Sequence, residues 1–160
     1  MKMRRIRQGM TLIEMVVTLT LFGVISTGVL TAYLTASRQT DQAMLKSETV
    51  TVARIASDTL LHDIQRAKNV TWADPVLTVT LYNDVTVTYT TVNTAEGPRL
   101  RRDGNDVVAS DYADISLVTT PGPVIDPVDR EVTLSIRVTV TRGGQSEDSL
   151  FTLTGTWRNV

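Results

Sequence analysis

The sequence contains no cysteine and only one histidine among its 160 residues. The absence of cysteine excludes disulfide bonds, thiolate metal ligands and a cysteine nucleophile, and it leaves the redox compartment undetermined. The formal net charge is −1, so the composition gives no sign of a general affinity for nucleic acids. The sequence also lacks a glycine-rich phosphate loop, a nucleophile elbow and a histidine–carboxylate constellation. We therefore expect no enzyme activity, no cofactor and no metal site.

Charge is scarce in one long segment near the N-terminus. Between Gln8 and Ser37 the only charged residue is Glu14, and the apolar core after it, residues 15–34, is 20 residues long. That length matches a helix that crosses the hydrocarbon core of a bilayer. The cations before it predict a cytoplasmic N-terminus, and they are Lys2, Arg4, Arg5 and Arg7. A plain signal anchor would share these features, but a carboxylate in an apolar run is costly and usually has a partner.

The stretch from Arg7 to Glu14, RQGMTLIE, resembles the type III signal of type IV pilins and pseudopilins. In that family a short basic leader ends in glycine, and glutamate is the fifth residue of the mature chain. The resemblance implies that prepilin peptidase cleaves between Gly9 and Met10 and N-methylates Met10. It also implies that Glu14 neutralises the terminal amine of a neighbouring subunit during assembly. The plain alternative for Glu14 is an interfacial acid that pairs with Arg7 or reaches the lipid headgroups.

The resemblance implies a structural subunit, a minor pilin or pseudopilin, in a type IV pilus, type II secretion or competence filament. Its partners would be prepilin peptidase, other subunits, the inner-membrane assembly platform and, before assembly, the lipid bilayer. The head would lie outside the cytoplasm, first on the membrane and then in the filament. A filament-tip binding module, such as an adhesin or a DNA receptor, is the alternative. The chain departs from many pilins because it has no cysteine and no proline in the apolar helix.

The amphipathic half of the same helix is expected to follow. Residues 38–68 contain neither proline nor glycine, and apolar residues recur there at helical spacing. This stripe comprises Leu45, Val52, Ala56, Leu60, Ile64 and Ala67, opposite a face with Lys46, Arg54, Asp58, His62 and Arg66. The predicted divisions are a leader (1–9), a transmembrane or filament-core helix (10–36), the amphipathic half (37–70) and a β-sheet head (71–160).

The head alternates apolar and polar residues with the period of β-strands. We predict one hairpin from residues 77–81 and 85–90, a second around 103–106, and a third from 132–140 and 151–157. The segment 119–127 is rich in proline and cannot be a central strand. The expected fold class is therefore α+β, with a long N-terminal helix packed through its second half on an antiparallel sheet.

Some head residues leave a choice between a functional and a structural interpretation. Arg99, Arg101 and Arg102 could contact phosphates, although a solvated strand is the simpler interpretation. His62 with Asp58, or Asp58 with Asp63, could be catalytic or metal-binding groups, but a charged helix face explains them equally. Asp103, Asn105 and Asp106 hint at calcium, yet their spacing fits a turn better.

Overall fold

The computed structural model describes residues 11–158, which form one helix and nine strands. The elements are α1 (Leu12–Gln65), β1 (Ala67–Ala73), β2 (Val76–Leu81), β3 (Thr86–Thr94), β4 (Gly97–Arg102), β5 (Asn105–Asp106), β6 (Ala113–Leu117), β7 (Val124–Asp126), β8 (Glu131–Arg142) and β9 (Gln145–Thr156). The chain divides into two compact units, Met1–Gln42 and Ala43–Val160. We call the second the C-terminal unit. It holds all the strands and the second part of α1, so the predicted α+β class is confirmed.

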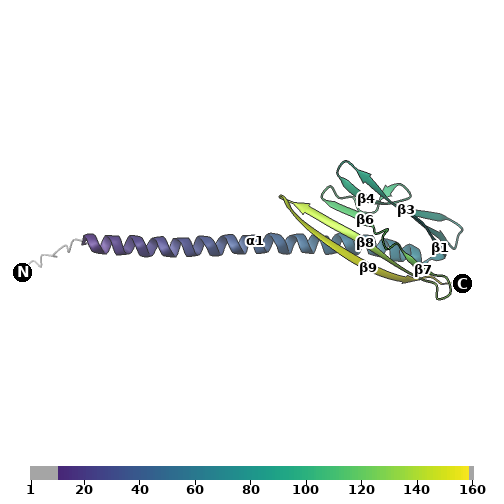
Figure 1. Ribbon diagram of the computed structural model, residues 1–160, viewed down its shortest axis with the longest axis horizontal. Helices are drawn as coiled ribbons and strands as arrows, with labels where there is room; N and C mark the ends of the chain where they lie inside the picture. Colours follow the sequence, from purple (N-terminus) through teal and green to yellow (C-terminus); the bar gives the residue numbers. More distant parts are fainter. Residues whose placement is uncertain (1–10, 159–160) are drawn as a thin grey trace, which may run out of the picture. The chain divides into compact units, whose positions relative to one another are not determined.

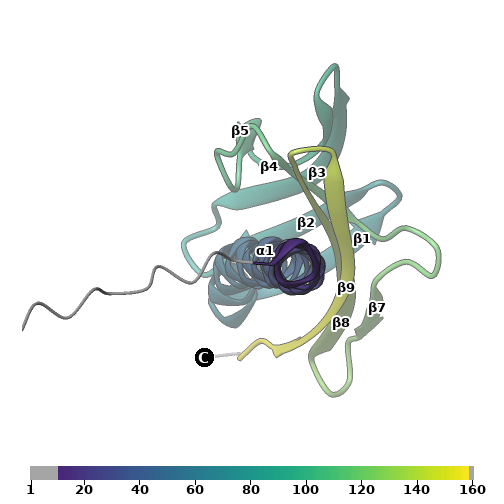
Figure 2. The ribbon, with the colours of Figure 1, turned by 90° about the vertical axis from the view of Figure 1, so that its left-hand side faces the viewer.

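The strands of the C-terminal unit form two antiparallel sheets rather than the single sheet that the alternation suggested. One sheet has the order β1-β2-β3-β4-β5. In the other, β8 pairs with β6 and β7 along one side and with β9 along the other. Both sheets curve around the second part of α1 (Figures 1 and 2). The shared core lies between that part of the helix and the inner faces of the sheets.

The apolar stripe on α1 is confirmed by burial. Leu45, Val52, Ala56, Leu60 and Ile64 are at most 6% exposed, while the charged residues of the opposite face are exposed. Burial of a valine, leucine or isoleucine side chain contributes about 1.5–3 kcal/mol to the stability of the fold. The stripe therefore holds the sheets on the helix.

The helix ends earlier than the sequence indicated. The amphipathic half was expected to extend to residue 70, but α1 stops at Gln65 and residues 67–73 form strand β1. These residues form a strand because they pair with β2, from Ala67↔Leu81 to Ala73↔Val76. This pairing buries Ala67 and Val70 in the core. The spacing of these two residues, three apart, fits either a helix or a bulged strand, and the pairing decides between them.

The longest hairpin joins β8 to β9 through Gly143 and Gly144. Both glycines have positive φ, 58° and 79°, as a two-residue hairpin turn requires. On β8 the buried residues are Val132, Leu134, Ile136, Val138 and Val140, so every second side chain faces the core. On β9, Gly155 lies directly against α1. A Cβ placed there would lie 3.0 Å from Leu61 and 3.1 Å from Ile64.

Candidate functional site

Two of the three predicted site residues, Gly9 and Met10, lie outside the described residues. The third, Glu14, lies in the first turn of α1 and is exposed. Thr11 precedes the helix, and its carbonyl and side-chain oxygens accept the Glu14 N–H at 3.1 and 3.4 Å. Thr11 is therefore a helix N-cap. Within residues 11–158, no side chain forms a hydrogen bond or an ion pair with the Glu14 carboxylate.

The apolar part of α1 is long enough to cross a membrane. An 18-residue window has a mean hydropathy of 1.9, and none of it is buried inside the protein. Its threonines add little polarity, because each hydroxyl donates to a backbone carbonyl of the preceding turn. These bonds, at 2.8–2.9 Å, join Thr20 to Val17, Thr27 to Gly23, Thr31 to Thr27, and Thr35 to Thr31. Hydroxyls satisfied inside the helix are compatible with an apolar environment.

Comparison with protein families adds an independent observation. Residues 4–30 match the family model described as the prokaryotic N-terminal methylation motif. This chain carries a type IV pilin-like prepilin signal. Searches of curated proteins and of solved structures gave no match to the chain. The matched residues include Arg4, Arg5 and Arg7 of the basic segment, Glu14, and the first part of α1.

The prepilin signal has direct consequences for the chain's class. Such a signal implies processing by a prepilin peptidase and assembly with other pilins. Proteins of the pilin type are structural rather than enzymatic. The signal and the apolar part of α1 together fit a membrane-anchored protein of this type.

Outside the prepilin signal, each arginine of β4 forms an ion pair with an acidic residue of the same chain. Arg99 pairs with Glu96 at 3.2 Å, Arg101 with Asp106 at 2.8 Å, and Arg102 with Asp63 at 2.7 Å. The expectation of a solvated strand is wrong for Arg99, which is only 5% exposed and donates to the Ala113 carbonyl at 3.0 Å. A polar groove of about 690 Å³ is lined by the first two of these pairs. Because the charges are already paired, this surface gives no support to a phosphate-binding role.

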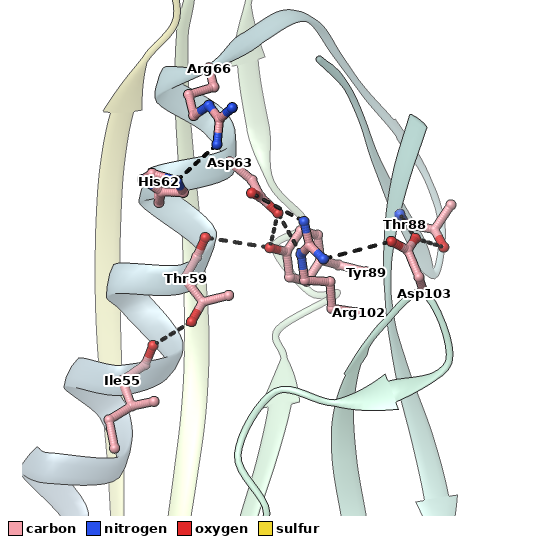
Figure 3. Close-up of polar contacts among 9 residues, drawn as sticks. All are labelled: Ile55, Thr59, His62, Asp63, Arg66, Thr88, Tyr89, Arg102 and Asp103. Carbon is pink, nitrogen blue, oxygen red and sulfur yellow. Dashed lines mark hydrogen bonds and ion pairs between the residues drawn. The ribbon is translucent and has the colours of Figure 1, made fainter. Parts of the chain in front are cut away.

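Asp63 joins the helix to the five-stranded sheet (Figure 3). It was expected on a charged helix face, yet it is only 4% exposed. Its carboxylate accepts hydrogen bonds from the Tyr89 hydroxyl at 2.6 Å and from Arg102 at 2.7 and 3.3 Å. Arg102 also lies 3.9 Å from Asp103, whose carboxylate accepts the Thr88 N–H at 2.7 Å. We call Asp63, Tyr89 and Arg102 the helix–sheet clamp.

The clamp shifts the titration of its members. Burial raises the pKa of Asp63, but the hydrogen bonds from Arg102 and Tyr89 and the attraction of Arg102 outweigh burial. The net pKa of Asp63 is therefore lower than that of a free carboxyl group. Burial, together with the hydrogen bond to Asp63, raises the pKa of Tyr89. The ionised Asp63 therefore stabilises the attachment of α1 to β3 and β4.

We expect Asp63→Asn to lower the free energy of unfolding at pH 7 by about 2 kcal/mol, because a charge-assisted network loses its anion. Since the folded pKa of Asp63 is lowered, its contribution is complete above the unfolded value of 3.8 and is lost as pH falls through the folded pKa. The difference between wild type and variant should therefore shrink below about pH 4. Urea unfolding at several pH values measures it. Asp58→Asn is the matched control, since Asp58 forms an exposed 3.8 Å pair with Arg54. A loss that is the same at every pH would contradict the clamp.

The other candidate side chains, His62 on α1 and the acids around β5, make structural contacts. The His62 ring lies 3.2 Å from the Arg66 guanidinium on the exposed face of α1. No group of three or more metal-ligating side chains occurs within the described part of the chain. Asp103 lies in the turn between β4 and β5, and Asp106 pairs with Arg101. These carboxylates therefore belong to the β4–β5 turn and its ion pair, in line with the interpretation of this segment as a turn.

Proposed function

We propose that this chain is a structural subunit, a minor pilin or pseudopilin, of a type IV pilus, type II secretion or competence filament. The observation that carries the proposal is the prepilin signal at residues 4–30, which runs directly into an unburied apolar helix. A compact unit with its own core follows, which suits a head carried on that helix. In this role the chain performs no chemistry of its own.

Each segment of the chain, starting from the N-terminus, has a proposed role. Residues 1–9 are a leader that remains in the cytoplasm because of its cations, and residues 10–36 are the membrane and filament-core helix. The amphipathic part of α1 and the strands form the extracytoplasmic part. A prepilin peptidase removes the leader after Gly9, and the inner-membrane assembly platform then moves the subunit from the bilayer into the filament.

Glu14 is proposed to act during that transfer. Cleavage after Gly9 creates an amine at Met10, close to a helix N-terminus whose free N–H groups already carry partial positive charge. A neighbouring subunit that enters an apolar filament core must have this amine neutralised. The carboxylate of Glu14 supplies the counter-charge, and pairing it with one amine only would set the axial register of neighbouring subunits.

Processing gives the direct test. Intact-mass analysis of protein taken from membranes of cells with an active prepilin peptidase should show loss of residues 1–9 and one added methyl group on Met10. Gly9→Leu should leave the unprocessed precursor in the membrane, because a bulky side chain occupies the position before the cut. Gln8→Leu, one residue away, is the matched control and should be processed. Recovery of full-length wild-type chain from such cells would contradict the proposal.

A further inference from the structure

Strand β9 forms a long border of its sheet. Within residues 11–158, β8 is the only strand that pairs with β9. The pairing runs from Arg142↔Gln145 to Glu131↔Thr156 without a shift in register, so the opposite side of β9 is an uninterrupted edge. Figure 1 shows β9 as the outermost strand beside β8.

The backbone groups directed to this edge can be identified. Trp157 N–H donates to the Arg130 carbonyl at 3.0 Å, which makes that pair a hydrogen-bonded one. In an antiparallel ladder such pairs alternate with pairs whose N–H and C=O groups point away from the partner strand. The outward-directed residues of β9 are therefore Ser146, Asp148, Leu150, Thr152, Thr154 and Thr156.

From residue 149 onwards, this edge lacks the features that normally prevent strand pairing. Residues 149–156 contain no charged residue and no proline, and the strand has no bulge. By comparison, β5 has two residues, β7 has three, and the edge of β1 carries an exposed Lys68. An unprotected strand of this length is a template for another strand.

The side chains of β9 show which apolar surface a further strand at this edge would cover. Phe151 and Leu153 lie on the inner face beside the core but are only partly buried. On the outer face, Leu150 is 58% exposed. At the C-terminal end of the strand, Gly155 lies close to Leu61 and Ile64 of α1. A strand beside β9 would therefore bury apolar surface on both faces.

We propose that the outer edge of β9 pairs with an extended strand from a neighbouring subunit of the same filament. The inference rests on the proposed function, which places like-oriented subunits side by side at high local concentration. A contact between one edge and a different surface of the next subunit is heterologous, and repeated heterologous contacts build open filaments. Near the start of β9, Asp148 lies 3.9 Å from Arg137 and accepts a hydrogen bond from the Thr139 hydroxyl at 3.1 Å, so its charge is already paired within the chain. The partner strand should carry a basic or neutral residue opposite Glu147.

Two substitutions block the edge and leave the backbone pairing with β8 in place. Thr152→Pro removes an N–H that points away from β8, a position where an edge strand accepts proline. It also loses the 3.1 Å hydrogen bond between the Thr152 and Ser135 hydroxyls, so Thr152→Val, which loses only that bond, is its control. Leu150→Lys places a charge on an exposed side chain. Both variants should be processed normally and melt like wild type in detergent. Their share in the sheared filament fraction, relative to processed protein in the membrane, should fall on the order of tenfold. Thr141→Lys, on exposed Thr141 of the neighbouring strand β8, is the control and should assemble normally.

Cross-linking identifies the partner. The chain has no cysteine, so Thr152→Cys provides a single thiol at the edge for a short cysteine-to-amine reagent. Thr141→Cys, on exposed Thr141 of β8 beside the hairpin turn, is the control. We expect an adduct with a filament subunit at residue 152 and not at residue 141. An adduct only with a protein that is not a subunit, or normal assembly of both blocking variants, would overturn the edge pairing alone. Absence of wild-type protein from the filament fraction would instead overturn the proposed function, and the inference with it.

Discussion

Leu60→Asp is expected to lower the free energy of unfolding of the C-terminal unit by about 4 kcal/mol or more. Leu60 is fully buried in the core that α1 shares with both sheets. An aspartate there either remains charged without a partner or takes up a proton, and both outcomes cost free energy. The methyl groups that fill the core at this point are lost as well.

The measurement uses residues 39–160, which omit the apolar part of α1 and should form a folded, soluble monomer because the stripe remains covered. Urea unfolding can be followed by the fluorescence of Trp157, which is only 6% exposed. Ile55→Asp on the same helix is the matched control, since Ile55 is 47% exposed and the change should cost less than about 1 kcal/mol. If Leu60→Asp unfolds at the wild-type urea concentration, the helix stripe is not the attachment surface.

The parts of this fold that repeat a local pattern could be predicted from sequence. The stripe from Leu45 to Ile64 has helical spacing, and β8 and β9 alternate around a Gly-Gly turn, so each signal lies within one element. The prepilin signal is equally local. Strand β1 was missed because its burial depends on pairing with β2, which its own residues do not encode.

The helix–sheet clamp illustrates a second limit. Asp63 and Arg102 are 39 residues apart, and each looks like an ordinary surface charge in its own segment. Arg99 was likewise assigned to a solvated face, although its guanidinium is buried against the Ala113 carbonyl. A charged residue can be buried when a distant segment supplies its partner, and only the tertiary structure places the two together. The half-buried Arg101 and Arg102 and the buried Arg99 share the same local pattern.

Glu14→Ala is expected to leave membrane insertion and leader removal unchanged while reducing assembly into filaments about tenfold or more. The substitution removes a carboxylate from an apolar helix, where a charge costs about 2.5–3.5 kcal/mol, so a plain membrane anchor should insert equally well or better. A filament subunit should instead lose the counter-charge for a neighbour's amine. The leader and Gly9 remain intact, so the peptidase still has its substrate.

The comparison that decides between these two roles is the amount of processed protein in the membrane against that in sheared filaments. Glu14→Gln keeps the shape and the hydrogen-bonding capacity of the side chain but not the charge, so it should assemble as poorly as Glu14→Ala if charge pairing matters. Thr18→Ala, one turn along the helix, removes only a hydroxyl that donates to the Glu14 carbonyl, and it should assemble normally. For a minor subunit the defect would appear as fewer filaments rather than none. Normal incorporation of Glu14→Ala would make Glu14 an interfacial acid, and the case for a filament subunit would then depend on cleavage after Gly9 alone.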